Sequence, residues 1–328
     1  MVAEVFAVLV LFTLFFFILS IPVGFYTAFA TTLSNAYNYA SYYPLFLFVG
    51  PIGVYLPGEQ NLGLLFVVFT SIYAAMMALA AFQGRSIPSA LKAASHEGVG
   101  AILSNYLLVT VVAVGFLTFT ASVVDIFVTT AGVPIGSLSG DAYLLFMSLA
   151  VAPLREEVGF RLVLIGIPAL ALAIGLPAKS YLKTLWRPSV ILERGEWNTE
   201  AKFLLGVTIA ISAIVFGIAH IDSASGWAIG KLPEAAYAGV VLGYLYVRYG
   251  LHVAVLTHWA FDYVSSVYAF FGQGVFGIPW TSSPGYWLEN VYLFEAFYLI
   301  GLASFLVVAY VGLKSFASRR AQASGALA

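Results

Sequence analysis

The strongest constraint on the fold of this chain is a series of apolar stretches, each about long enough to cross a lipid bilayer. A transmembrane helix needs about 20 predominantly apolar residues. Eight such stretches lie at 5–30, 62–82, 101–129, 142–175, 201–220, 232–248, 251–270 and 288–313. Charged residues make up only 9% of the 328 residues, against about 25% in soluble domains. We therefore predict an all-α, polytopic integral membrane protein with about eight transmembrane helices around a polar cavity.

The composition also excludes several classes of function. The formal net charge is −1, which gives nucleic-acid binding no electrostatic basis. The chain has no cysteine, so disulfides, thiolate metal sites and a cysteine nucleophile are excluded. The partners that we expect are the lipid bilayer and a membrane-associated protein or peptide. The sequence does not define an oligomeric state.

The chain is expected to form one membrane domain with three parts. Residues 1–140 would hold the N-terminal transmembrane helices, with an amphipathic cytoplasmic linker near 83–100. Residues 141–275 would form the functional core, and 276–328 a C-terminal transmembrane helix and a polar tail. The apolar stretch 44–56 is short and interrupted by prolines, which favours a re-entrant or interfacial piece.

The distribution of basic residues predicts the orientation in the membrane. Cytoplasmic loops of membrane proteins are enriched in Lys and Arg. With a cytoplasmic N-terminus, 11 of the 14 Lys and Arg residues fall on the inner side and the outer loops hold only Lys231. The other two, Arg155 and Arg161, lie inside a predicted span. Both termini are therefore predicted to be cytoplasmic.

Charged and titratable residues inside the apolar stretches mark the candidate site. A charged side chain at the bilayer centre costs roughly 3 kcal/mol on insertion scales, so such residues pair, face a cavity or take part in chemistry. Three predicted spans carry the motifs that we single out, which are Glu156, Glu157 and Arg161, then His220 one turn beyond Phe216, then His258 and Asp262.

Helical spacing indicates which of these side chains pair. Glu157 and Arg161 are four residues apart and can form an ion pair, whereas Glu156 is turned by about 100° and stays available for chemistry. The alternative is a buried ion network that only fixes helix packing. Pro153 precedes this motif, so we expect a kink or break there.

Each histidine motif has both a purely structural and a functional interpretation. His220 lies one turn beyond Phe216 and could simply bond a carbonyl at a helix end. His258 shares a helix face with Asp262, which could simply orient the imidazole. Together with Glu156, these groups could take a proton from water and stabilise an oxyanion. Two histidines and two carboxylates also match a zinc site, formed if present by Glu156, His220, His258 and Asp262.

The three motifs resemble those of the CPBP family, the CAAX protease and bacteriocin-processing family of intramembrane proteases. The family pattern EExxxR is matched by Glu156, Glu157 and Arg161. The pattern FxxxH is matched by Phe216 and His220, and a histidine followed by Asn or Asp at the fourth position is matched by His258 and Asp262. The motifs occur in the family's order, and the resemblance covers about 140–270.

The resemblance implies hydrolysis of a peptide bond within the membrane, in a substrate that is prenylated in some relatives. We expect no cofactor, with zinc as the alternative. By this resemblance, Glu156 and His220 activate water, and His258 and Asp262 occupy the oxyanion positions. Glu157, Arg161 and Phe216 would then have supporting roles.

The aspartate in the third motif differs from the asparagine of the family's prenyl-protein protease and keeps the zinc alternative open. Asp262 stands where an asparagine would donate a hydrogen bond, and an ionised aspartate has no donor. It would have to be protonated, orient His258 or bind a metal. The rival functions are a non-catalytic immunity or scaffold protein and a proton-coupled transporter, although the inverted repeats of transporters are not evident. By the predicted spans, His220 and His258 also lie at different depths.

Overall fold

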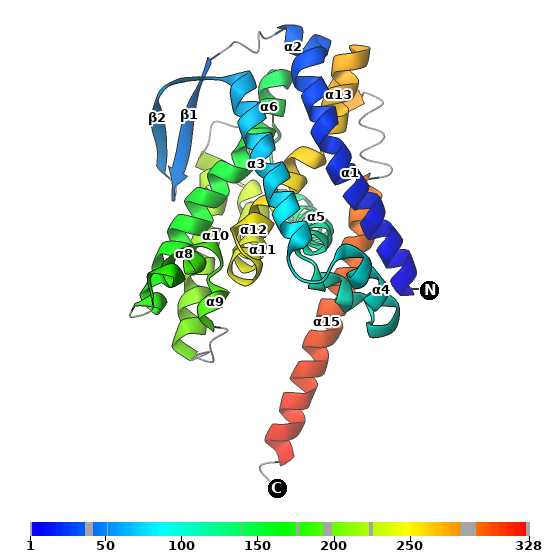
Figure 1. Ribbon diagram of the computed structural model, residues 1–328, viewed down its shortest axis with the longest axis vertical. Helices are drawn as coiled ribbons and strands as arrows, with labels where there is room; N and C mark the ends of the chain where they lie inside the picture. Colours follow the sequence, from blue (N-terminus) through cyan, green and yellow to red (C-terminus); the bar gives the residue numbers. More distant parts are fainter. Residues whose placement is uncertain are drawn as a thin grey trace.

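The structure is a computed structural model that describes residues 2–36, 42–50, 52–138, 140–174, 177–192, 199–222, 226–282 and 293–325. It is a helical bundle with a single β-hairpin among these residues (Figure 1). The all-α membrane fold predicted from the sequence is therefore confirmed. The two chain termini lie toward the end of the bundle opposite the hairpin.

The N-terminal part of the chain supplies three long apolar helices and two short ones. They are α1 (Val2–Ala30), α2 (Thr32–Ala36), α3 (Leu62–Phe82), α4 (Ile87–Glu97) and α5 (Tyr106–Thr130), with a short 3₁₀ turn at Val99–Ser104. Asn61 caps α3 and Asn105 caps α5, since each side-chain oxygen accepts a hydrogen bond from a backbone N–H of the first turn. The predicted amphipathic linker near 83–100 contains α4.

The rest of the chain forms the functional core and the last helix. The elements are α6 (Ala142–Glu157), a π-helix at Val158–Gly166, α7 (Ile167–Ala169), a 3₁₀ turn at Leu170–Ala173, α8 (Ala178–Trp186), α9 (Ser189–Leu192), α10 (Thr199–Asp222), α11 (Lys231–Tyr249), α12 (Leu251–Trp259), a second π-helix at Ala260–Val264, α13 (Val267–Phe276), a 3₁₀ turn at Trp280–Ser282, and α15 (Phe294–Gly325).

Four helices in the described part of the chain are long and apolar enough to cross a membrane. They are Ala3–Ala30, Leu62–Phe82, Tyr106–Thr130 and Thr199–Ile221. The predicted spans 142–175 and 251–270 are divided by π-helices, and α11 carries Lys231, Glu234 and Arg248. The last predicted span, 288–313, lies partly outside the described residues. The number of eight crossings therefore stays a prediction.

The stretch 44–56 belongs to a β-hairpin, which its apolar pattern did not indicate. Strand β1 (Tyr42–Val49) pairs antiparallel with β2 (Ile52–Asn61), and Val49 lies opposite Ile52 next to the turn. Gly50 in this turn has a φ of 60°, a conformation that glycine adopts readily. Aromatic and β-branched residues in both strands favour extended backbone.

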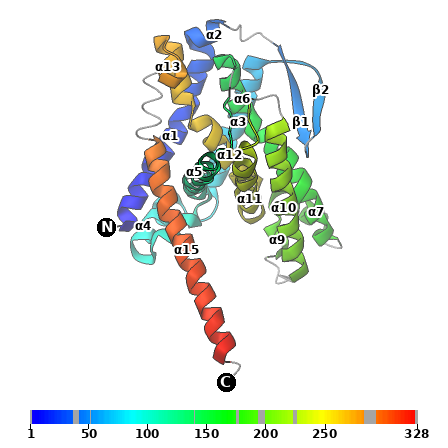
Figure 2. The same cartoon turned by 180° about the vertical axis from the view of Figure 1, so that it is seen from behind.

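Helix α12 lies at the centre of the bundle and positions the third motif. All of its residues are buried, and it packs against α3, α5, α6 and α11. Close packing of α10 on α11 depends on small residues, because a side chain at Gly239 would lie 2.7 Å from the Cα atom of Ala213. On the other face, α15 packs along α5 (Figure 2), where Gly115 lies beside Ile300.

Candidate active site

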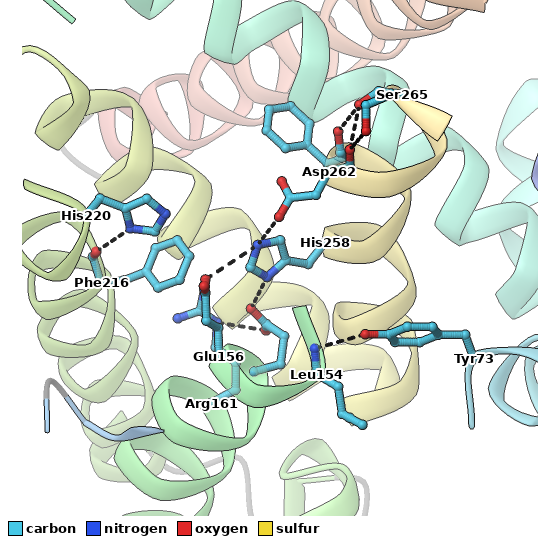
Figure 3. Close-up of polar contacts among 12 residues, drawn as sticks. Tyr73, Leu154, Glu156, Arg161, Phe216, His220, His258, Asp262 and Ser265 are labelled. Atoms are coloured by element: carbon cyan, nitrogen blue, oxygen red, sulfur yellow. Dashed lines mark hydrogen bonds and ion pairs between the residues drawn. The ribbon is translucent and has the colours of Figure 1, made fainter. Parts of the chain in front are cut away.

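A cavity of about 190 Å³ lies between α6, α10, α11 and α12, and its lining includes Glu156, His220, His258 and Asp262. These are the four side chains to which the sequence assigned a catalytic role. Aromatic and aliphatic side chains, including Phe216, make up much of the remaining wall. The structure thus brings all three motifs to one polar site within an apolar bundle (Figure 3).

The two carboxylate motifs lie where α-helices change into π-helices. Helix α6 ends at Glu157 and continues as the π-helix Val158–Gly166, and Asp262 lies inside the π-helix Ala260–Val264. π-Helical segments are rare and occur frequently at functional sites. Of the kink or break expected at Pro153, the break is wrong in position, because α6 continues through Pro153. The regular α-helix ends four residues later.

A tyrosine of α3 supports the helix at Pro153. The hydroxyl oxygen of Tyr73 accepts a hydrogen bond from the backbone N–H of Leu154, at 3.3 Å. Tyr73 is fully buried, and its ring stacks on that of Trp259 with 5.1 Å between centroids. This contact fixes the backbone two residues before Glu156.

Glu157 connects the first motif to the third. Its Oε1 lies 2.9 Å from Nδ1 of His258, and its Oε2 lies 3.0 Å from Nε of Arg161. The side chains of Glu157 and Arg161 are fully buried. The predicted ion pair is therefore present, and the same carboxylate also holds the imidazole, a contact between helices that spacing along one helix cannot indicate.

Both remaining carboxylates face the other nitrogen of His258. Nε2 lies 3.3 Å from Oδ2 of Asp262 and 3.7 Å from Oε2 of Glu156 (Figure 3). Three acidic side chains thus surround one imidazole, of which the ring is almost entirely buried. Such an arrangement is stable when a proton is shared at Nε2, because an imidazolium compensates the neighbouring negative charge.

His220 approaches the cavity from the C-terminal end of α10. Its Nδ1 lies 2.8 Å from the carbonyl oxygen of Phe216. Because a carbonyl only accepts, Nδ1 carries the proton, and in the neutral ring Nε2 carries the lone pair. The interpretation of this histidine as a ring bonded to a carbonyl thus describes Nδ1, and the lone pair of a neutral ring belongs to Nε2.

The ring of Phe216 contacts both imidazoles, and this places them at similar depths. The ring centroids lie 4.5 Å from His220 and 5.7 Å from His258. The expected difference in depth assumed that α12 starts at the membrane surface. Instead, His252 in its first turn is fully buried and stacks on Trp186 of α8, so α12 begins inside the protein.

Residues 138–264 match the family model for the type II CAAX prenyl endopeptidase, Rce1-like. The match confirms the predicted CPBP resemblance. It includes all seven side chains of the three motifs and supports an intramembrane protease as the general function. No curated protein and no solved structure matches the chain significantly.

Part of the cavity is built by residues outside the matched segment. Phe48 of β1 and Leu117 of α5 line the cavity. The hairpin reaches the first motif at Gly159, whose carbonyl oxygen accepts a hydrogen bond from the N–H of Gly50 at 3.4 Å. Arg155 lies under the ring of Phe46, 4.3 Å from its centroid.

Sequence reasoning missed these residues, and only one left a usable signal. A glycine two positions after a pair of glutamates in a predicted span suggests a close backbone approach. At Gly159 that approach is real, because a side chain there would lie 2.3 Å from Cβ of Phe48. Tyr73 and Phe48 are ordinary aromatic residues of membrane segments, and nothing in the sequence sets them apart.

The far wall of the cavity holds a second ion pair. Nζ of Lys231 lies 2.5 Å from Oε2 of Glu234, and it lies over the ring of Trp227 at 4.2 Å. All three residues line the cavity. The predicted outer-loop position of Lys231 corresponds to the first residue of α11.

The side chains around the cavity bear on the zinc alternative, because zinc needs several free donor atoms directed at one point. Within the described ranges, no group of three or more histidine or acidic side chains is arranged to hold a metal ion. Both nitrogens of His258 face carboxylates, and Nδ1 of His220 faces a backbone carbonyl. The residues as placed do not fit a zinc site.

Proposed function

We propose that this protein is an intramembrane endopeptidase that hydrolyses a peptide bond in a membrane-associated protein or peptide by means of activated water. The observation that carries the proposal is the convergence on His258 of Glu156, Glu157 and Asp262, in the cavity that His220 also lines. Burying so many titratable groups is costly unless they are paired or functional.

Glu156 and His220 are the groups that we assign to water activation. Glu156 contacts His258 only at 3.7 Å, and its side chain is 16% exposed, whereas Glu157 is held by two partners. Nε2 of His220 carries a lone pair when the ring is neutral. A carboxylate and an imidazole facing one cavity can take the proton of a water molecule as it attacks the scissile carbonyl.

His258 is the group that we assign to stabilisation of the oxyanion. Glu157 at Nδ1 and Asp262 at Nε2 both favour the imidazolium form. A fixed cation beside the cavity would stabilise the negative charge that develops on the carbonyl oxygen. Asp262 would then orient and charge His258, which resolves the departure from the asparagine of the family pattern without a donor on residue 262.

The reaction is proposed to need no metal ion or other cofactor. This follows from the donor arrangement, in which the imidazole nitrogens of His258 are engaged by carboxylates. Purified protein that cleaves a peptide at the same rate before and after dialysis against a chelator would support this, and activity restored only by zinc would contradict it.

We also propose a class of substrate and an orientation of the protein in the membrane. The bilayer location favours a substrate that is itself attached to the membrane, with or without a prenyl group. The basic residues favour cytoplasmic termini.

The function is tested in proteoliposomes with a fluorogenic peptide library, synthesised with and without a farnesyl group. Cleavage by the wild-type protein that is lost in Glu156→Gln supports the proposal. A correctly folded wild-type protein that cleaves no peptide would instead favour the non-catalytic immunity or scaffold function.

A further inference from the structure

Ser212 of α10 links the second motif's helix to the first motif. It lies four residues before Phe216 and is fully buried. Its hydroxyl accepts a hydrogen bond from Nη1 of Arg161 at 3.1 Å and donates one to the carbonyl oxygen of Phe160 at 2.7 Å. One serine therefore holds both a side chain and the backbone of the π-helix that follows Glu157.

The contacts continue from Ser212 to His258 without a gap. Arg161 is fully buried, pairs with Glu157 at 3.0 Å, and lies over the ring of Phe216 at 4.6 Å. Glu157 in turn bonds Nδ1 of His258. Because the carboxylate beside Arg161 acts as an acceptor, Nδ1 is the nitrogen that donates and Nε2 is the nitrogen that faces the cavity.

We propose that Ser212 is a positioning residue: through Arg161 and Glu157 it fixes which nitrogen of His258 faces the cavity. The proposal rests on the function proposed above for His258. Without the hydroxyl, Nη1 of Arg161 loses its partner in a site from which water is excluded, and a buried donor seeks another acceptor. Glu157 already pairs with Arg161 through Nε at 3.0 Å, so a shifted Arg161 would compete with His258 for that carboxylate.

The test compares Ser212→Ala with Thr208→Val as a matched control. Thr208 is a buried hydroxyl one turn earlier on the same helix, but it donates to the carbonyl oxygen of Leu205 in its own helix and to no other group among the described residues. We expect Ser212→Ala to lower kcat about tenfold, the order expected for loss of a hydrogen bond to a charged group, and to displace the pH profile of kcat. Thr208→Val should keep both.

A second measurement does not depend on activity. In protein labelled with ¹⁵N-histidine, solid-state NMR distinguishes protonated from unprotonated ring nitrogens, and His258→Gln assigns the signals of His258. We expect Ser212→Ala to change these signals and Thr208→Val to leave them unchanged.

The outcomes separate the positioning role from the proposed function. Unchanged His258 signals in Ser212→Ala, or a lower kcat with the wild-type pH profile, would overturn the positioning role. If the wild-type protein cleaves no peptide, the proposed function fails, while the NMR comparison still decides whether Ser212 positions His258.

Discussion

Nδ1 of His258 lies 2.9 Å from Oε1 of Glu157, and Nε2 of the same ring lies 3.7 Å from Oε2 of Glu156. The two adjacent glutamates of the first motif therefore lie at opposite nitrogens of one imidazole. Glu157 is buried and bound on both sides, whereas Glu156 faces the cavity. Two residues of the same type, one position apart, therefore have different roles because the helix turns by about 100° between them.

Glu156→Gln should lower the rate of peptide cleavage at least about 100-fold, because the amide keeps the shape of the side chain but removes the base. The melting temperature in detergent should stay close to that of the wild type. Glu234→Gln is the control, since Glu234 lines the same cavity but pairs with Lys231. Full activity in Glu156→Gln would show that water is activated elsewhere.

His220→Asn should also abolish cleavage while the fold is retained. Its amide can still donate to the carbonyl oxygen of Phe216, but it has no basic nitrogen. Thermal unfolding and cleavage are measured together. His252→Asn serves as the contrast, because His252 bonds Gln83 and stacks on Trp186, away from the cavity lining. His252→Asn should lower the melting temperature, whereas its kcat should change little. Loss of cleavage in His252→Asn but not in His220→Asn would contradict the assignment of His220 as a base.

Glu157→Gln should act first on stability. The change leaves the fully buried Arg161 without its carboxylate, and breaking a buried pair in this way costs about 3–5 kcal/mol. The melting temperature in detergent should therefore fall clearly. The double variant Glu157→Gln, Arg161→Met removes both charges and should recover part of the loss. A double variant less stable than Glu157→Gln would argue against a simple pair.

Asp262→Asn separates the possible roles of this residue. If its negative charge holds His258 as an imidazolium, the amide should lower kcat about tenfold without changing metal content. An activity equal to or above that of the wild type would indicate that residue 262 donates to the oxyanion directly. Joint loss of bound zinc and activity, measured by elemental analysis, would restore the zinc interpretation.

Gly159→Ala should detach the β-hairpin from the first motif. The added methyl group would lie 2.3 Å from Cβ of Phe48 and 2.5 Å from its carbonyl oxygen, so the strand has to move. Cleavage should fall, and protease should cut the hairpin faster. Gly206→Ala on α10 is the control, because no atom lies within 4 Å of the new methyl group. Equal behaviour of the two variants would refute the packing role.

The overall class, and the four side chains that come together around the cavity, could be predicted from the sequence, because both depend on local patterns. Apolar length predicts a membrane helix, and Glu157 with Arg161 share a helix face. The contact of Glu157 with His258 could not be predicted, because it joins residues 101 positions apart. The π-helices were missed because a stretch such as 251–270 has the same apolar composition whether its turns are α or π.

The predicted difference in depth between His220 and His258 was wrong for a related reason. Hydropathy marks where a stretch is apolar, but it does not show whether the stretch starts at the lipid surface or beneath another helix. Trp186 and His252 stack face to face at 5.3 Å, and this packing of α8 over the start of α12 is a tertiary contact. The β-hairpin was missed because its prolines and aromatic residues also suit an interfacial loop.

The wall contributed by Phe48 and Leu117, and the support that Tyr73 gives to Leu154, come from helices and strands that precede residue 138. The three charged motifs are therefore not a portable module. Grafted onto another membrane scaffold, they would bring the acidic and imidazole groups but neither the aromatic side chains that line the cavity nor the tyrosine hydroxyl that bonds the backbone of α6. In this protein, the N-terminal third and the three motifs build the cavity together.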